Sequence, residues 1–128
     1  IDGSQVVRVT RLAERIHQYV PPGSRVVGST PLWWGMRDTD YRSYLLFFYK
    51  TRPDAGPYKT TISGYLDDYH PQYLVLTRMA IGELQKYLSP RDFADWPTYM
   101  SAHARKIARI EGPVVIGAYG FIDVWRFD

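Results

Sequence analysis

The sequence contains no cysteine, which excludes disulfide bonds, thiol nucleophiles and thiolate metal ligands. The cellular compartment stays open, because exported proteins can also lack cysteine. Long apolar runs are missing as well. The longest, residues 44–49, is far below the roughly 20 residues that a helix needs to cross a bilayer. The given segment also opens without the charged, apolar and small-residue regions of a signal peptide, so we expect it to be soluble.

Neither sign of charge dominates the chain. Sixteen Lys and Arg residues stand against 13 Asp and Glu residues, for a net charge of +3. No block of five like charges occurs, so the basic excess is typical of a solvated surface. Aromatic residues, in contrast, are abundant at 16%, with 11 tyrosines among them. A length of 128 residues is enough for one domain with one core, and we expect residues 1–128 to be that domain.

Helix and strand signals alternate through most of the chain. Between Ser4 and Val20 apolar side chains recur every three or four positions, which predicts an amphipathic helix that ends before Pro21. A β-branched run at residues 25–29 then predicts a buried strand. We further expect a loop or short helix at 31–42, a strand at 44–49, a helix from 60 or 61 to 69, a strand at 72–77, and helices at 79–88 and 92–99.

The end of the chain has a different pattern. Residues 104–110 and 119–127 are rich in strand formers and flank a Gly-rich segment, which predicts an antiparallel pair. Alternating elements followed by clustered strands predict an α/β fold, namely a single-domain three-layer α/β sandwich with a mixed sheet and an antiparallel C-terminal strand pair.

The triplet Asp38-Thr39-Asp40 is a candidate ligand site. Two carboxylates two residues apart on an extended loop can approach one divalent cation or a sugar nucleotide. The structural alternative is a turn, because Asp bonds readily to backbone two residues on and the flanking Arg37 and Arg42 can neutralise both acids. The sequence favours the turn.

A second set of polar residues is Asp67 and His70, which are neighbours on one face of a predicted helix and could begin a metal site. Two ligands do not complete such a site, and the sequence favours a polar helix end with His70 near the carbonyl dipole. His17, on the polar flank of the first helix, and His103 have no evident Ser or Asp partner for a catalytic triad. The glycines match neither a dinucleotide fingerprint nor a phosphate-binding loop.

Aromatic residues gather in the stretch from Thr30 to Tyr49. Five of them could stack sugars or bases: Trp33, Trp34, Tyr41, Tyr44 and Tyr49. The structural alternative, which the sequence favours, is that these side chains close the core or pack against a neighbouring domain. Exposure distinguishes the two interpretations, and the sequence alone does not give it.

Three stretches in order carry a family resemblance: "LAERIHQYVPPGSRVVGSTPLWWGMRDTDYRSY", "YLDDYHPQYLVLT" and the closing "YGFIDVWRF". They resemble the soluble C-terminal region of polytopic membrane glycosyltransferases of the dolichyl-phosphate-mannose mannosyltransferase-like superfamily. That region has an amphipathic helix, a "PPGSRVVG"-like turn and strand, a helix ending in a "pDYvvl"-like strand, and a final aromatic strand. Gln72 stands here where aspartate is usual in the family.

The resemblance implies a parent enzyme that moves a sugar from a polyprenyl-phosphate donor on the outer side of the cytoplasmic membrane. It also implies that the catalytic acid lies in an early membrane-proximal loop of the parent, so we expect this chain to be a non-catalytic fragment at the extracytoplasmic face of the cell membrane. A start at Ile1 fits that expectation. The expected ligand or membrane contacts are Trp33, Trp34, Asp38, Asp40 and Tyr41, with the two tryptophans as candidate membrane anchors.

Two other functions remain open at this point. One is a stand-alone metal-dependent enzyme that uses Asp38, Asp40, Asp67 and His70. The other is a nucleic-acid-binding module, which a net charge of only +3 disfavours. Under the leading interpretation we expect no cofactor, no bound metal and no nucleic acid. The expected partners are the transmembrane part of the same polypeptide and either the membrane surface or a glycan acceptor.

Overall fold

A five-stranded mixed sheet forms the centre of the protein in the computed structural model, which describes residues 11–111 and 120–128. The strand order is β2-β1-β3-β5-β4. The strands are β1 (Arg25–Gly28), β2 (Asp40–Ser43), β3 (Tyr73–Thr77), β4 (Ala104–Ile110) and β5 (Ile122–Phe127). β1 is parallel to both β2 and β3, whereas β5 is antiparallel to both β3 and β4. The predicted mixed sheet with an antiparallel C-terminal pair is therefore confirmed.

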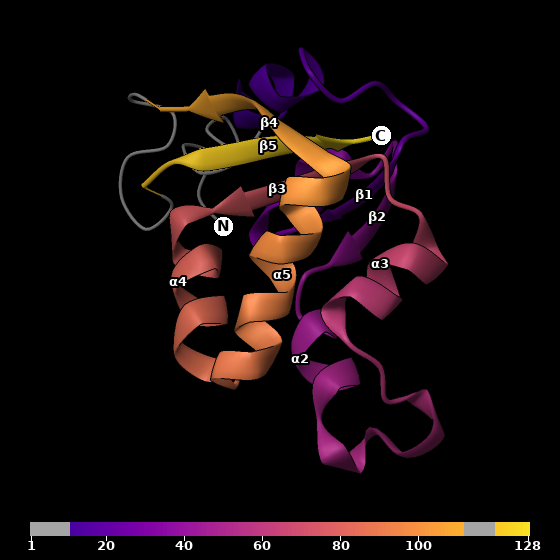
Figure 1. Cartoon of the computed structure of the whole chain (residues 1–128). Coiled ribbons are helices and arrows are strands. Elements are labelled where there is room, and N and C mark those ends of the chain that lie inside the picture. The colour runs from indigo at the N-terminus through magenta and orange to yellow at the C-terminus, as the bar shows by residue number, and fades with distance from the viewer. Residues whose placement is uncertain (1–10, 112–119) are drawn as a thin grey trace.

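Helices cover both faces of this sheet, which makes three layers (Figure 1). One face carries α2 (Leu46–Thr51), α3 (Ile62–Tyr69), α4 (Arg78–Tyr87) and α5 (Pro90–His103). The other face carries the helix over residues 11–17 and the 3-10 helix η1 (Thr30–Met36). A second 3-10 segment, η2 (Pro53–Tyr58), connects α2 to α3. The predicted three-layer α/β sandwich is confirmed.

Alternating strand residues supply the two apolar clusters between the layers. Val27 and Leu74 point into the cluster under the four α-helices, whereas their neighbours Val26 and Val75 point into the cluster under η1. β3 lies between β1 and β5 and is buried over its whole length, as its continuous apolar run predicts. Full burial of an aliphatic side chain of this size contributes about 1.5–3 kcal/mol, so both clusters stabilise the fold substantially.

Hydroxyl side chains cap three of the helices. Thr61 caps α3, Thr77 caps α4 and Ser89 caps α5, each by accepting a hydrogen bond from a backbone N–H in the first turn. A cap of this kind stabilises a helix by about 1 kcal/mol. The predicted cap at residue 60 or 61 is thus confirmed at Thr61. α5 begins directly after Ser89 and is longer than the predicted helix at 92–99.

The prediction of a strand at residues 44–49 is wrong, because helix α2 begins at Leu46. The buried positions in this segment are Tyr44, Phe47 and Thr51, spaced by three and four residues, so one helical face enters the core. Tyr49 lies 54% exposed on the opposite side. A short apolar run can be wrapped as a helix when a covering layer buries only one side of it.

Strand β2 (Asp40–Ser43) overlaps the end of the segment, 31–42, that the sequence assigned to a loop or short helix. Its four residues alternate between exposed and half-buried positions, because β2 is an edge strand that pairs only with β1. Most of its side chains are polar, so the segment carries no apolar run that would signal a strand. η1 fulfils the short-helix part of the expectation.

Two expected elements extend beyond the described residues. The first helix is observed at residues 11–17, and positions 4–10 of the prediction lie outside the described part. The same holds for position 119 of the predicted last strand. None of the helices observed in the described part combines the length and the apolar character that a membrane span requires.

Candidate functional site

The two adjacent tryptophans are held on the surface by the 3-10 helix η1. Trp33 and Trp34 are 49% and 56% exposed, while Leu32 and Met36 of the same segment are buried in the core. The two indole rings meet edge to face, with centroids 6.3 Å apart. The Arg37 guanidinium carbon lies 5.6 Å from the Trp33 ring centroid and 5.0 Å from that of Trp34. We call Trp33, Trp34 and Arg37 the tryptophan cluster.

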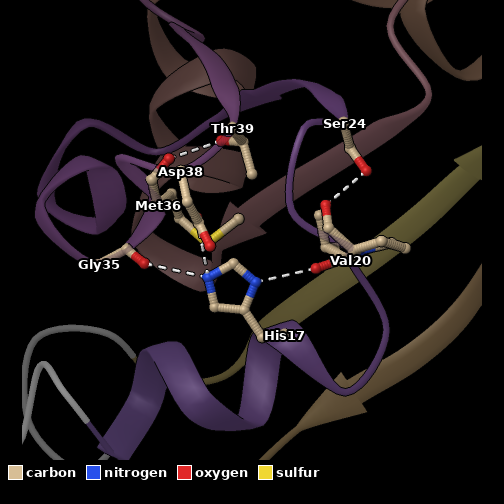
Figure 2. Close-up of polar contacts among 8 residues, drawn as sticks. His17, Val20, Ser24, Gly35, Met36, Asp38 and Thr39 are labelled. Carbon is tan, nitrogen blue, oxygen red and sulfur yellow. Dashed lines mark hydrogen bonds and ion pairs between the residues drawn. The ribbon is translucent and has the colours of Figure 1, made fainter.

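His17 attaches this segment to the first helix (Figure 2). Its Nδ1 lies 2.9 Å from the Val20 carbonyl oxygen, and its Nε2 lies 3.2 Å from both the Gly35 carbonyl oxygen and Asp38 Oδ1. Oxygen atoms thus face both ring nitrogens. His17 therefore bridges the end of the helix and the loop behind the tryptophan cluster, a role that its position on the polar flank of the helix did not reveal.

Asp38 and Thr39 form a turn behind the tryptophan cluster. The Thr39 hydroxyl donates to the Met36 carbonyl oxygen at 2.6 Å, and the Thr39 backbone N–H donates to the same oxygen at 3.0 Å. The Asp38 carboxylate faces His17, and Arg37, which the sequence suggested as a partner for these acids, lies against the two indoles instead. Local turn geometry therefore fixes the first acid of the triplet.

Asp40 begins strand β2 and lies in different surroundings from Asp38. Its carboxylate lies 3.9 Å from Arg42 Nε, as the sequence suggested, and both side chains are about half exposed, so the pair is weak. The Asp40 carbonyl oxygen accepts a hydrogen bond from the Tyr69 hydroxyl at 2.6 Å. These contacts tie the second acid of the triplet to strand β2 and helix α3.

Tyr41 closes a gap in the sheet. Its hydroxyl donates to the Ser29 carbonyl oxygen at 2.6 Å, and burial raises its pKa far above the ordinary value of 10.0. The phenol occupies the space next to Gly28, the residue of β1 that has no side chain. In the structure Tyr41 thus makes a packing contact between neighbouring strands.

Asp67 and His70 lie near the C-terminal end of α3, beside a cavity of about 560 Å³. The Asp67 carboxylate accepts a hydrogen bond from the Tyr99 hydroxyl at 2.8 Å, and burial followed by this hydrogen bond raises the pKa of Tyr99 to about 12. His70 caps α3 in the left-handed conformation, with φ of 53°, and its carbonyl oxygen accepts from Arg25 Nε at 2.8 Å. His70 therefore ends the helix, as the structural alternative suggested, and Asp67 joins α3 to α5.

Metal-binding chemistry needs several such groups together. Over residues 11–111 and 120–128, no group of three or more His, Asp or Glu side chains is placed to hold an ion. Asp38 and Asp40 are each tied to separate neighbours, and Asp67 hydrogen-bonds to Tyr99. The four residues of the metal-dependent alternative thus do not form one cluster in the described part.

The sequence did not reveal a buried charge in the last strand. Asp123 of β5 is 1% exposed and forms a bidentate pair with Arg109, through distances of 2.7 and 2.9 Å, and a further contact with Lys106 at 3.1 Å. This hydrogen bonding raises the pKa of Arg109. An acid at an inward position of an apolar strand was the available signal, because a buried carboxylate requires a partner. The group joins β4 to β5 and has a structural role.

Comparison with known proteins does not identify a family for this chain. No protein-family model, curated protein or solved structure matches the chain. Of the residues expected to contact a ligand or membrane, Trp33 and Trp34 form an exposed pair, whereas Asp38, Asp40 and Tyr41 contact neighbouring parts of the fold. The tryptophan cluster is the exposed aromatic part of this segment, and the Asp38 and Asp40 side chains are also about half exposed, at 49% and 54%.

Proposed function

We propose that this chain is a non-catalytic extracytoplasmic accessory domain of a membrane glycosyltransferase that uses a polyprenyl-phosphate sugar donor. We also propose that the domain contacts the membrane interface through the tryptophan cluster. The observation that carries this proposal is the rigid presentation of two half-exposed indoles with a guanidinium group against both rings. The order of helix, turn, strands and closing aromatic strand in the sequence supports the family part of the proposal.

The chemistry of the tryptophan cluster suits the interfacial region of a bilayer. Indole rings favour the headgroup level because one edge is polar and the rest is apolar, and a nearby cation is attracted to anionic lipids by about 1 kcal/mol. The segment should lose little conformational entropy when it binds, because Leu32 and Met36 already anchor it in the core and His17 holds the loop behind it. The partner to which we commit is therefore an anionic lipid surface.

The contacts of Asp38 and Asp40 support the proposal that the catalytic residues lie in another part of the parent enzyme. Asp38 pairs with His17, and Asp40 lies between Arg42 and the strand edge. A general acid or base needs a hydrogen-bond path to substrate, and these carboxylates are engaged in holding a turn and a strand end. We expect the purified chain to transfer no sugar from a polyprenyl-phosphate hexose. Turnover by the chain alone would refute this part of the proposal.

Vesicle flotation tests the membrane contact. The protein should float with vesicles that contain phosphatidylglycerol and should bind less to vesicles of phosphatidylcholine alone, because Arg37 favours anionic headgroups. A Trp33→Ala/Trp34→Ala variant should remain in the unbound fraction. The matched control is Tyr87→Ala, which removes a 66% exposed aromatic ring from α4 and should float like the parent protein.

Two results of the flotation experiment would contradict the proposed contact. One is failure of the unaltered protein to float with phosphatidylglycerol vesicles at low ionic strength, where electrostatic attraction is strongest. The other is equal flotation of the double tryptophan variant and the unaltered protein. Circular dichroism of the variant confirms that the fold is intact, which is expected because both indoles are largely outside the core.

A further inference from the structure

A pocket of about 510 Å³ opens among strand β2, helix α2, segment η2 and helix α3. We call it the basic pocket. The sequence did not indicate it, because its residues come from four separate elements. Its charged and aromatic lining consists of Arg42, Lys50, Tyr58, Lys59, Tyr65, Asp68 and Tyr69.

Cations outnumber anions in the basic pocket. Arg42, Lys50 and Lys59 contribute three positive charges against the single carboxylate of Asp68, a net charge of +2. Arg42 also approaches Asp40, which is outside the lining, but only at 3.9 Å and with both side chains about half exposed. In the described part of the chain, Lys50 and Lys59 form no ion pair. The charges of Lys50 and Lys59 are therefore available to a ligand, whereas that of Arg42 is partly shared with Asp40.

Aromatic rings hold two of these cations in place. The Arg42 guanidinium carbon lies 4.3 Å from the Tyr69 ring centroid, and Lys50 Nζ lies 5.8 Å from that of Tyr65. The two tyrosine rings stack, with centroids 6.2 Å apart and an interplanar angle of 22°. Cation–π contacts restrict the long side chains without neutralising them, so less ordering is needed when an anion binds.

The Tyr65 hydroxyl is a second, independent sign of a ligand. Tyr65 is only 5% exposed, and in the described part of the chain its hydroxyl makes no well-aligned hydrogen bond, although the Arg42 side chain lies close enough to lower its pKa. Buried hydroxyl groups are nearly always paired, so an unpaired one can accept or donate a further hydrogen bond, to an ordered water or to a bound anion. Burial raises the pKa of Tyr65, and the nearby Arg42 offsets part of that rise.

We propose that the basic pocket binds a phosphate monoester, carried either by a free sugar phosphate or by a lipid headgroup. Such a group carries a charge of about −1.5 to −2 near neutral pH and offers three acceptor oxygens, which match the net charge of +2 and the donors of Arg42, Lys50 and Tyr65. The pocket volume also accommodates a sugar ring, for which the 75% exposed Tyr58 provides an apolar face.

The basic pocket is separate from the tryptophan cluster. The helices α2 and α3 belong to the four-helix layer, whereas η1 packs on the opposite face of the sheet. Phosphate binding therefore stands or falls independently of the membrane contact proposed above. Each can be tested in variants that leave the other unchanged.

Isothermal titration calorimetry of the 128-residue chain with three probes tests the proposal. Inorganic phosphate and a hexose 1-phosphate should bind, the hexose phosphate more tightly, and the hexose without phosphate should not. Affinity should fall as salt is added, because the contact is ionic. Absence of binding at about 10 mM hexose 1-phosphate, which would saturate even a millimolar site, would overturn the proposal for a free sugar phosphate.

Single substitutions locate the binding to the basic pocket. Arg42→Gln and Lys50→Gln should each weaken hexose 1-phosphate binding about tenfold, the usual cost of one charge-assisted hydrogen bond. The control Lys86→Gln removes a cation from α4, outside the pocket lining, and should bind like the unaltered protein. Equal affinity of Lys50→Gln and the unaltered protein would overturn the assignment.

Tyr65→Phe separates ligand binding from folding. This variant should bind the hexose phosphate several-fold more weakly while unfolding at the same or a higher urea concentration, because it loses only an unpartnered hydroxyl. A purely structural role of Tyr65 would not weaken binding in a stable variant. If Tyr65→Phe binds with unchanged affinity, the Tyr65 hydroxyl does not contact the ligand.

A vesicle arm distinguishes the two sources of phosphate. In the Trp33→Ala/Trp34→Ala background, vesicles with phosphatidic acid, a monoester headgroup, are compared with vesicles of phosphatidylglycerol, a diester. Preference for phosphatidic acid that Lys50→Gln abolishes identifies a lipid headgroup, whereas calorimetric binding without that preference identifies a free sugar phosphate. Failure of both arms would refute the phosphate site and leave the membrane contact of the tryptophan cluster untouched.

Discussion

Replacing Tyr65 with phenylalanine should stabilise the protein, because the hydroxyl that is removed is buried without a hydrogen-bond partner in the described structure. The ring itself has important neighbours. It stacks on Tyr69 at a centroid distance of 6.2 Å and meets Phe47 edge to face at 5.9 Å. Phenylalanine keeps both contacts, so the substitution isolates the hydroxyl.

The magnitude follows from the cost of burying an unpaired polar group. An unsatisfied hydroxyl costs about 1–3 kcal/mol, and we expect Tyr65→Phe to recover about 1 kcal/mol of unfolding free energy. For a domain of this size such a gain raises the melting temperature by about 4 °C. The raised pKa of Tyr65 does not affect this comparison near neutral pH, because the hydroxyl is protonated there in both the folded and the unfolded protein.

Tyr44→Phe is the matched control with the opposite sign. Tyr44 is buried to the same degree, at 6% exposure, in the same apolar cluster, but its hydroxyl donates to the Glu83 carboxylate. A hydrogen bond to a charged group contributes about 1.5–3 kcal/mol, and the partial exposure of Glu83 favours the lower end. We therefore expect Tyr44→Phe to lose about 1.5 kcal/mol.

Urea denaturation at pH 7, followed by tryptophan fluorescence and circular dichroism, measures both variants. The midpoint should rise for Tyr65→Phe and fall for Tyr44→Phe at unchanged slope, since neither variant alters the surface exposed on unfolding. Equal destabilisation by the two substitutions would refute the reasoning, because it would show that the Tyr65 hydroxyl has a partner in the free protein.

Three further predictions address the sheet, the alkaline limit and the metal alternative. Gly28→Ala should cost about 1–3 kcal/mol in urea denaturation, because the added Cβ would lie 2.7 Å from the Val75 carbonyl oxygen and closer still to the Tyr41 hydroxyl. Full rescue by Tyr41→Ala would contradict this account, since the backbone clash would remain. Tyr99 has a pKa raised from 10.0 to about 12, so it contributes stability below about pH 10 that is lost as pH rises through 12. Urea midpoints measured from pH 8 to pH 11.5 should therefore fall less in Tyr99→Phe than in the unaltered protein, and identical profiles would argue against it. Mg²⁺, Ca²⁺ and Zn²⁺ should leave the melting temperature unchanged, whereas a dedicated site would add about 2.7 kcal/mol at 100 times its dissociation constant. A rise that Asp67→Asn abolishes would favour the metal-dependent enzyme.

The architecture was predictable because its strongest signals are local. The apolar run that became β3 is buried on both faces, and the spacing of apolar residues in α4 places one stripe on the sheet. Thr61 marks the start of α3 through its side-chain oxygen, whereas the cap that Ser89 provides for α5 was not predicted. In these places propensity, periodicity and capping agree, so the sequence specifies the element without help from distant residues.

Elements at the edge of the fold were less predictable. The apolar run at residues 44–49 has the composition of a strand, but its outcome depends on the position of the covering layer, which buries Phe47 and leaves Tyr49 exposed. β2 carries mostly polar side chains and exists because β1 offers it backbone hydrogen bonds. In both cases tertiary contacts override the local pattern.

Much of the candidate site depends on distances between residues far apart in the chain. The exposure of Trp33 and Trp34, and the use of Arg37 on their rings, required the structure. Pairing of Asp38 with His17, 21 positions earlier, could not be inferred from the neighbouring arginines. The basic pocket depends on four elements that meet in space, and its three cations and Tyr65 are too far apart for a short sequence motif to contain them.

Quenching of tryptophan fluorescence by brominated lipid chains tests the central claim most directly. Of the four tryptophans, Trp33 and Trp34 are about half exposed, whereas Trp96 and Trp125 are 8% and 9% exposed in the apolar cluster between the sheet and the four-helix layer. Vesicles of brominated phosphatidylglycerol should quench the unaltered protein, and the Trp33→Ala/Trp34→Ala variant should keep its remaining emission. Quenching that persists in the double variant, or none in the unaltered protein, would contradict a membrane contact through the tryptophan cluster.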